Sequence, residues 1–172
     1  MQHSIAAVRK ASSDENPHAA LTLALTLPDV CASLESSDGR TTGAKYAAWW
    51  DTYLLPTYTI QIGSPPVEHV FLTGGDCYAL RCAVLHQGLD DVSEQNARQV
   101  LEKFHFVQPR NSNVVIHRNQ AGLALNLQVD IFCEEICQGV EAWLCAIGAR
   151  QDVLDRIEAL MKIDDLSGGW SM

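Results

Sequence analysis

Residues 123–129, LALNLQV, decide the fold class, because the apolar side chains at 123, 125, 127 and 129 alternate with other residues. This two-residue period is typical of a strand with one buried face. The pairs Phe104/Phe106 and Val114/Ile116 repeat the pattern earlier in the chain, and residues 118–122, RNQAG, predict a turn. We therefore expect a small antiparallel sheet within roughly residues 104–130.

The rest of the chain shows helical periodicity, with apolar residues three and four positions apart. Asn16 and Pro17 predict a helix start, and Pro28 either kinks that helix or begins a second piece. The expected helices are 17–34, 43–55, 76–88, 93–101, 133–147 and 151–163, whereas the proline-rich residues 56–69 are expected to form a loop. The sequence predicts one domain over residues 1–172: a helical-bundle core with a small antiparallel sheet, of the mostly α, α+β class.

Composition limits the classes of function. The 172 residues suffice for one ordinary core, and 47% of them are hydrophobic. A formal net charge of −9 opposes tight, nonspecific binding to nucleic acid, since that affinity comes largely from Lys and Arg. Residues 1–12 lack the apolar segment of a secretory signal, and the apolar run 19–27 is too short to span a bilayer. We expect a soluble, cytoplasmic protein without a membrane segment.

Four aromatic residues, Tyr46, Trp49, Trp50 and Tyr53, share one face of the expected helix 43–55. Aromatic side chains at this spacing usually pack in a core. Stacking on a nucleobase is the alternative.

The stretch that could carry chemistry is residues 76–88, DCYALRCAVLHQG. Thr73 predicts a capping box with Asp76, and Gly88 predicts the C-terminal end of the helix. Five residues of an ideal helix correspond to about 140° of rotation, so Arg81 and His86 converge only if the helix end distorts or two chains meet. Another set, Tyr78, Cys82 and His86, shares a face at i, i+4 and i+8.

An arginine, four intervening residues and a histidine near a helix end, here residues 81–86, RCAVLH, resemble the signature of the HEPN superfamily. Those are small helical domains, many of them RNases of toxin–antitoxin and abortive-infection systems. The resemblance implies a homodimer whose motif helices line one cleft, and metal-independent cleavage of RNA. It implies that Arg81 binds the phosphate and that His86 acts as acid or base. Asp76 or Tyr78 would assist.

The residue types suit this chemistry. The 2′-hydroxyl must lose a proton and the leaving oxygen must gain one, and histidine can do either near neutral pH. A guanidinium can hold the charge of the transition state with two hydrogen bonds. No cofactor and no metal ion are expected.

The same residues also fit a purely structural interpretation. Asp76 would cap its helix, Arg81 would pair with an acid such as Asp76 or one elsewhere, and His86 would bond a carbonyl at the helix end. The alternative function is then a non-catalytic protein-interaction or dimerisation module, which an acidic surface suits better than it suits RNA.

Two weaker candidates lie near the C-terminal half. Cys133 and Cys137, at i and i+4, could supply two metal ligands, but a structural zinc site needs four, so core packing is the favoured interpretation. His117 and Arg118 are expected in a solvated turn, with a surface contact patch as the alternative.

Overall fold

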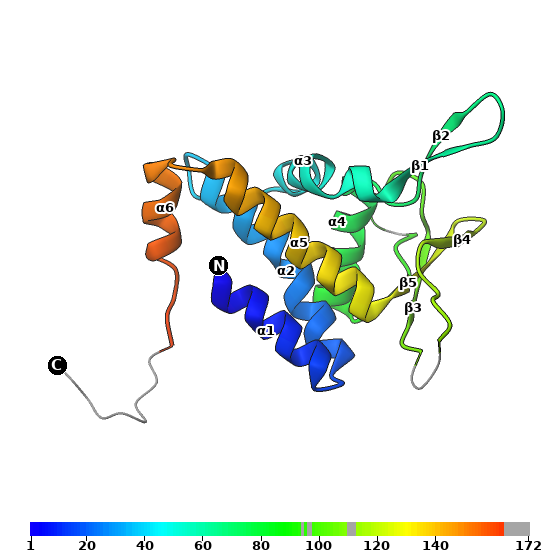
Figure 1. Ribbon diagram of the computed structural model, residues 1–172, viewed down its shortest axis with the longest axis horizontal. Coiled ribbons are helices and arrows are strands. Elements are labelled where there is room, and N and C mark those ends of the chain that lie inside the picture. Colours follow the sequence, from blue (N-terminus) through cyan, green and yellow to red (C-terminus); the bar gives the residue numbers. More distant parts are fainter. Residues whose placement is uncertain (94, 96–97, 110–112, 164–172) are drawn as a thin grey trace.

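Two long helices, α2 (Pro17–Glu35) and α5 (Val129–Ile147), cross the middle of the protein and supply much of its core (Figure 1). The structure is a computed structural model that describes residues 1–93, 95, 98–109 and 113–163. The remaining α-helices are α1 (Gln2–Ser13), α3 (Gly43–Tyr53), α4 (Gly74–Cys82) and α6 (Gln151–Glu158). The predicted fold class, mostly helical with little sheet, is confirmed.

Local chemistry explains where α2 begins. The Asn16 side chain accepts a hydrogen bond from the Ala19 N–H at 3.2 Å, and Pro17 occupies the first turn, where its missing N–H costs nothing. The helix continues through Pro28 as a single element. Pro28 therefore does not begin a second helix but lies within α2.

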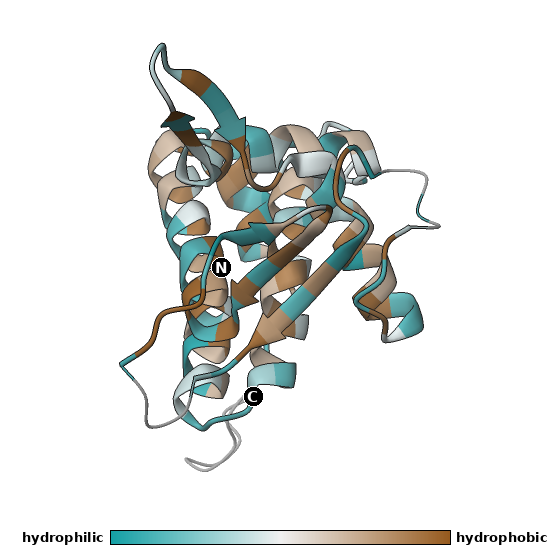
Figure 2. Ribbon diagram, turned by 90° about the vertical axis from the view of Figure 1, so that its right-hand side faces the viewer, coloured by the Kyte–Doolittle hydropathy of each residue, from teal (hydrophilic) through white to brown (hydrophobic). Residues whose placement is uncertain are grey.

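The sheet in the second half of the chain is mixed. It contains β3 (Lys103–Val107), β4 (Asn119–Ala121) and β5 (Ala124–Gln128), in the order β3-β5-β4. The expected antiparallel arrangement holds for β4 and β5, but β3 runs parallel to β5, with Phe104 beside Leu125. β4 runs opposite to β3, and the turn at Gly122 reverses the chain again, so β5 repeats the direction of β3. Figure 2 looks onto this sheet, with helices behind it.

Three further expectations about local structure are wrong. The expected strand around Val114 and Ile116 has no strand pairing among the described residues, and the Ile116 N–H instead donates to Gln128 Oε1 at 3.1 Å. Residues 56–69 are not a loop throughout: a 3₁₀ turn (Leu55–Tyr58) leads into a hairpin of β1 (Thr59–Ile62) and β2 (Val67–Val70). In the expected helix 93–101, none of the described residues 93, 95 and 98–101 is helical, and residues 94, 96 and 97 lie outside the described part.

The aromatic face of α3 belongs to the core. Tyr46, Trp49 and Trp50 are buried, and Trp50 Nε1 donates to the Leu72 carbonyl at 3.3 Å. Tyr58 lies against Trp50 with ring centroids 5.4 Å apart. The core interpretation is thereby confirmed for Tyr46, Trp49 and Trp50, and Tyr53 packs against the same core while partly buried.

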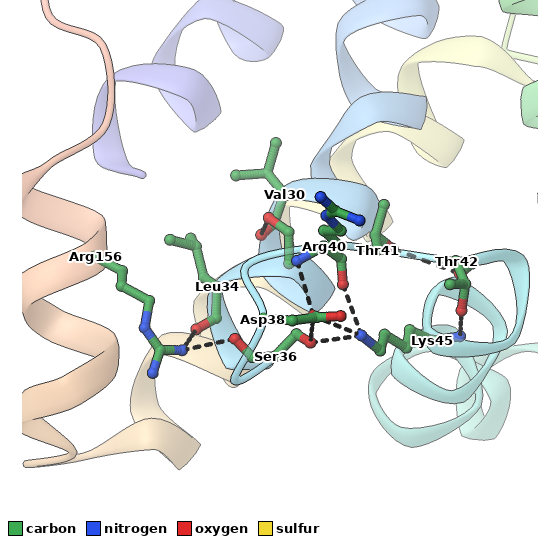
Figure 3. A network of polar contacts seen from close by, with 10 residues as sticks. Val30, Leu34, Ser36, Asp38, Arg40, Thr41, Thr42, Lys45 and Arg156 are labelled. Atoms are coloured by element: carbon green, nitrogen blue, oxygen red, sulfur yellow. Dashed lines mark hydrogen bonds and ion pairs between the residues drawn. The ribbon is translucent and has the colours of Figure 1, made fainter.

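Polar contacts fasten α6 and α3 to the loop after α2 (Figure 3). Arg156 Nη1 donates to the carbonyls of Leu34 and Ser36, at 2.5 and 3.1 Å. Lys45 Nζ lies 3.0 Å from the Asp38 carboxylate, and hydrogen bonds from Ser36 and Lys45 hold the pKa of Asp38 below its usual range. In the described part of the chain, no helix combines the length and apolar character needed to cross a bilayer.

Candidate functional site

The helix that carries the Arg81–His86 motif changes its geometry between the two residues. After α4 ends at Cys82, residues Ala83–Gln87 form a π-helical turn, in which the Gly88 N–H reaches the Ala83 carbonyl. Gly88 closes the turn with a φ of 69°, in the left-handed region where glycine carries no steric penalty. A π-bulge of this kind is frequent at functional sites.

The π-turn brings the two motif side chains into contact. Arg81 Nη1 lies 2.9 Å from His86 Nε2 within one chain, although an ideal helix would hold the two residues about 140° apart. The distortion that the spacing required near Gly88 is therefore present. His86 is exposed, whereas the Arg81 side chain is only 21% exposed.

Asp29 on α2 fixes the guanidinium from the other side. Arg81 Nε donates to Asp29 Oδ2 at 2.6 Å, and the Asp29 side chain is 12% exposed. Burial opposes the charge of the guanidinium, but the Asp29 carboxylate outweighs it and raises the pKa of Arg81. The acid that Arg81 was expected to find is thus Asp29, which is not on its own helix.

The contact assigns complementary roles to the two side chains. A guanidinium only donates hydrogen bonds, so His86 Nε2 is the accepting atom in this contact. A neutral imidazole with an accepting nitrogen is the form that can take a proton from a hydroxyl. Arginine has five N–H donors, and Asp29 and His86 engage one each, so donors remain for an anion.

Tyr78 lies beside this pair at the protein surface. Its ring packs on Tyr46 with centroids 5.4 Å apart, and its hydroxyl is hydrogen-bonded to Cys82. Burial, followed by the contact with Cys82, raises the pKa of Tyr78 above its ordinary value. A neutral hydroxyl at this place can orient a bound group but does not act as a base near neutral pH.

Asp76 has a different position from the other three candidates. It is 1% exposed, and its Oδ1 accepts the N–H groups of Gln99, Val100 and Leu101 at 2.7, 3.0 and 3.2 Å. Thr73 caps the helix by accepting the Asp76 N–H and donates its own hydroxyl proton to Asp76 Oδ2. Among the described residues, these bonds engage the carboxylate with the segment before β3 and not with Arg81 or His86.

A close approach of α3 fixes the start of α4. A Cβ atom at Gly74 would lie 2.4 Å from the Ala47 carbonyl oxygen, so only glycine fits there. The Gly74 N–H donates to Asp51 Oδ1 at 2.8 Å. Gly74, the first of the two glycines before Asp76, therefore serves helix packing.

The π-turn also borders a cavity of about 580 Å³. Val84 and Gly88 contribute to its lining from the turn, Leu21 and Thr22 from α2, and Phe106 from β3. A flat, largely apolar ring is the type of group that such a lining accommodates.

A second histidine cluster lies at the junction of sheet and helices, and the sequence did not reveal it. The His117 side chain is 3% exposed, with Nε2 3.0 Å from Glu135 Oε2 and Nδ1 accepting the Gln128 N–H at 3.2 Å. The Tyr58 hydroxyl donates to the same Glu135 oxygen at 2.5 Å, and the Arg118 guanidinium lies 5.9 Å from the Tyr58 ring centroid. The expectation of a solvated turn is wrong for His117.

The cysteine pair on α5 is buried. Burial raises the pKa of Cys133 to about 12 and that of Cys137 to about 11, so both remain thiols at neutral pH. In the described ranges, no group of three or more His, Cys, Asp and Glu residues is arranged to hold a metal ion. The core interpretation fits both residues.

Comparisons with protein-family models, with curated protein sequences and with solved structures find no match to this chain. The geometry of the site is therefore the basis on which a function can be proposed.

Proposed function

We propose that this protein is a HEPN-like, metal-independent endoribonuclease of a toxin or phage-defence type that acts in the cytoplasm. The observation that carries the proposal is the Arg81–His86 contact of 2.9 Å at an exposed π-turn. A guanidinium beside an imidazole supplies both a phosphate ligand and a proton acceptor.

In the proposed reaction, the RNA phosphate takes donors of Arg81, including the one that His86 Nε2 accepts in the free protein. His86 Nε2, released from that contact, takes the proton of the 2′-hydroxyl. The 2′-oxygen then attacks phosphorus while the bond to the 5′-oxygen breaks, leaving a 2′,3′-cyclic phosphate. The protonated His86 then returns this proton through a water molecule to the leaving 5′-oxygen, so one copy of the motif suffices for the step. Negative charge on the transition state is stabilised by the fixed guanidinium.

The neighbouring residues take supporting roles in this proposal. Asp29 orients Arg81 through its 2.6 Å bond, and Tyr78 assists by orienting the substrate. Asp76 acts indirectly, because it holds residues 99–101 against the start of the motif helix. The cavity beside the π-turn accommodates a base next to the cleaved bond.

The test is cleavage of several fluorescent RNAs by the purified protein in excess EDTA. The proposal expects 2′,3′-cyclic phosphate ends and a loss of at least about a hundredfold in Arg81→Ala and His86→Ala, as for removal of an acid–base group. His105→Ala is the matched control, since His105 is exposed on β3 and lies outside the motif. Wild-type protein without cleavage, or equal loss in the control, would overturn the proposal.

The second candidate function is a non-catalytic protein-interaction or dimerisation module. The observation that favours it is an exposed hairpin with apolar side chains, where Ile62 is 50% and Val67 66% exposed. Absence of RNA cleavage, together with stable self-association, would support this function.

A further inference from the structure

The β1–β2 hairpin stands out from the body of the protein (Figures 1 and 2). All residues from Ile60 to Glu68 are exposed. The two strands pair antiparallel, with Ile60 opposite His69 and Ile62 opposite Val67. Because directly opposed residues share a face, one face of the hairpin carries Ile60, Ile62, Val67 and His69.

This face is apolar and uncovered. Ile60, Ile62 and Val67 are 39%, 50% and 66% exposed. Single exposed apolar residues are ordinary, but contiguous ones on a projecting element indicate an interaction site.

The outer edge of β1 offers backbone groups for pairing. In the described part of the chain, the sheet of β1 contains only β2 besides it. The Phe71 N–H donates to the Tyr58 carbonyl directly opposite, which makes 58/71, 60/69 and 62/67 the hydrogen-bonded pairs. The N–H and C=O groups of Gln61 therefore point away from β2, toward the outer edge, whereas the N–H of Thr59 already donates to the Pro56 carbonyl.

The two edges of the hairpin differ in charge. β1 reads TIQI and has no charged side chain, whereas β2 reads VEHV and contains Glu68. Charged residues on edge strands oppose pairing with further strands, so β2 is protected and β1 is not. In a chain with a net charge of −9, an uncharged strand is also where a second copy meets the least repulsion.

We propose that β1 pairs antiparallel with β1 of a second copy, and that Gln61 lies at the two-fold axis. A two-fold axis normal to the sheet requires the paired residue numbers to have an even sum, which the pairs 61/61 and 60/62 satisfy. Gln61 then forms a hydrogen-bonded pair with its counterpart through the outward backbone groups. Ile60 opposes Ile62 of the second copy, so the two apolar faces join.

The register limits the assembly to a dimer. Pairing uses the open edge of each copy, and the four-stranded sheet that results ends on both sides in β2 with Glu68. An isologous contact of this kind is closed and does not grow into a filament. The inference does not depend on RNA cleavage, since the hairpin and the motif helix are separate elements.

The test introduces a negative or a positive charge at residue 61, which lies at the proposed axis. Molar mass is then measured by light scattering over a concentration series. Wild-type protein is expected at twice 18.9 kDa. Gln61→Glu places two carboxylates opposite each other and should weaken dimerisation at least tenfold, as should Gln61→Lys with two ammonium groups. Mixing the two variants should restore the dimer, because a glutamate then faces a lysine.

Glu68→Gln on the outer strand is the control and should leave the dissociation constant unchanged within about twofold. Circular dichroism checks that the variants fold. A monomeric wild type, a Gln61→Glu variant that dimerises as well as wild type, or a mixture that does not recover would each overturn the proposal. Loss of RNA cleavage with an unchanged dimer would bear only on the proposed function.

Discussion

Each of the two histidine clusters combines His, Arg and an acid, yet their environments differ. At the π-turn, His86 is exposed and touches Arg81 through one ring nitrogen. At the sheet junction, His117 is buried, and both its ring nitrogens are hydrogen-bonded, to Glu135 and to the Gln128 N–H. The residue types alone do not distinguish a reactive cluster from a structural one. The exposure of the histidine and its unused hydrogen-bonding groups distinguish them.

The largest expected effect is in the buried cluster. Glu135→Ala removes the oxygen that accepts from both Tyr58 and His117, and it leaves two buried donors without a partner. We expect a loss of about 3–5 kcal/mol in the free energy of unfolding, measured by urea denaturation.

Glu135→Gln is the matched control, because it keeps one acceptor oxygen in the same volume. A loss of about 1–2 kcal/mol is expected for it. If Glu135→Ala were as stable as wild type, the cluster would not be a stabilising centre, and the contrast with the π-turn would fail.

Capping residues in the sequence predicted some helix ends. Asn16 and Thr73 each cap the helix that follows, and Gly88 ends the motif helix, because these signals depend only on neighbouring residues. Ends without such a signal were misplaced: α5 begins at Val129 instead of residue 133, and α6 ends at Glu158 instead of residue 163. The parallel pairing of β3 with β5 joins residues about 20 positions apart, and no local pattern encodes such a pairing. The hairpin at 59–70 was missed because prolines and a glycine dominate that stretch.

The candidate site was only partly readable. The Arg81–His86 spacing was recognised, but the π-turn that joins the two residues has no signature in the sequence beyond Gly88. Asp29 carried a signal that was overlooked: between His18 and Leu34 it is the one charged residue in an otherwise apolar and neutral helix. His117 was misjudged because turn-like neighbours predict exposure, whereas its burial comes from Glu135 on α5.

A smaller effect is expected at the π-turn. Arg81→Ala leaves the half-buried Asp29 carboxylate without its cation, for an expected loss of about 1–3 kcal/mol at pH 7. Burial already raises the pKa of Asp29 from the ordinary 3.8, and loss of the arginine raises it further. The unpaired Asp29 carboxylate costs no stability where Asp29 is protonated in both the folded and the unfolded state. The loss of stability in Arg81→Ala should therefore be smallest near pH 4 and grow as the pH rises.

Urea denaturation of Arg81→Ala between pH 4 and 8 measures this dependence. The double variant Asp29→Asn/Arg81→Ala carries no buried charge at the site, and it should recover stability and lose the added pH dependence. A loss that is constant across this range would show that Arg81 acts through packing and not by pairing with Asp29.

The smallest effect on stability is expected for His86, which is one of the two residues with a large proposed effect on catalysis. His86 is exposed and forms one contact, so His86→Ala should cost less than about 0.5 kcal/mol, as for other surface positions. His117→Ala leaves the buried Gln128 N–H and the Tyr58–Glu135 pair without the ring, and it should cost about 2–4 kcal/mol. Urea denaturation of both variants under one condition makes the comparison direct. Equal losses would mean that the π-turn also depends on its histidine for stability, and the separation between a structural and a reactive cluster would no longer hold.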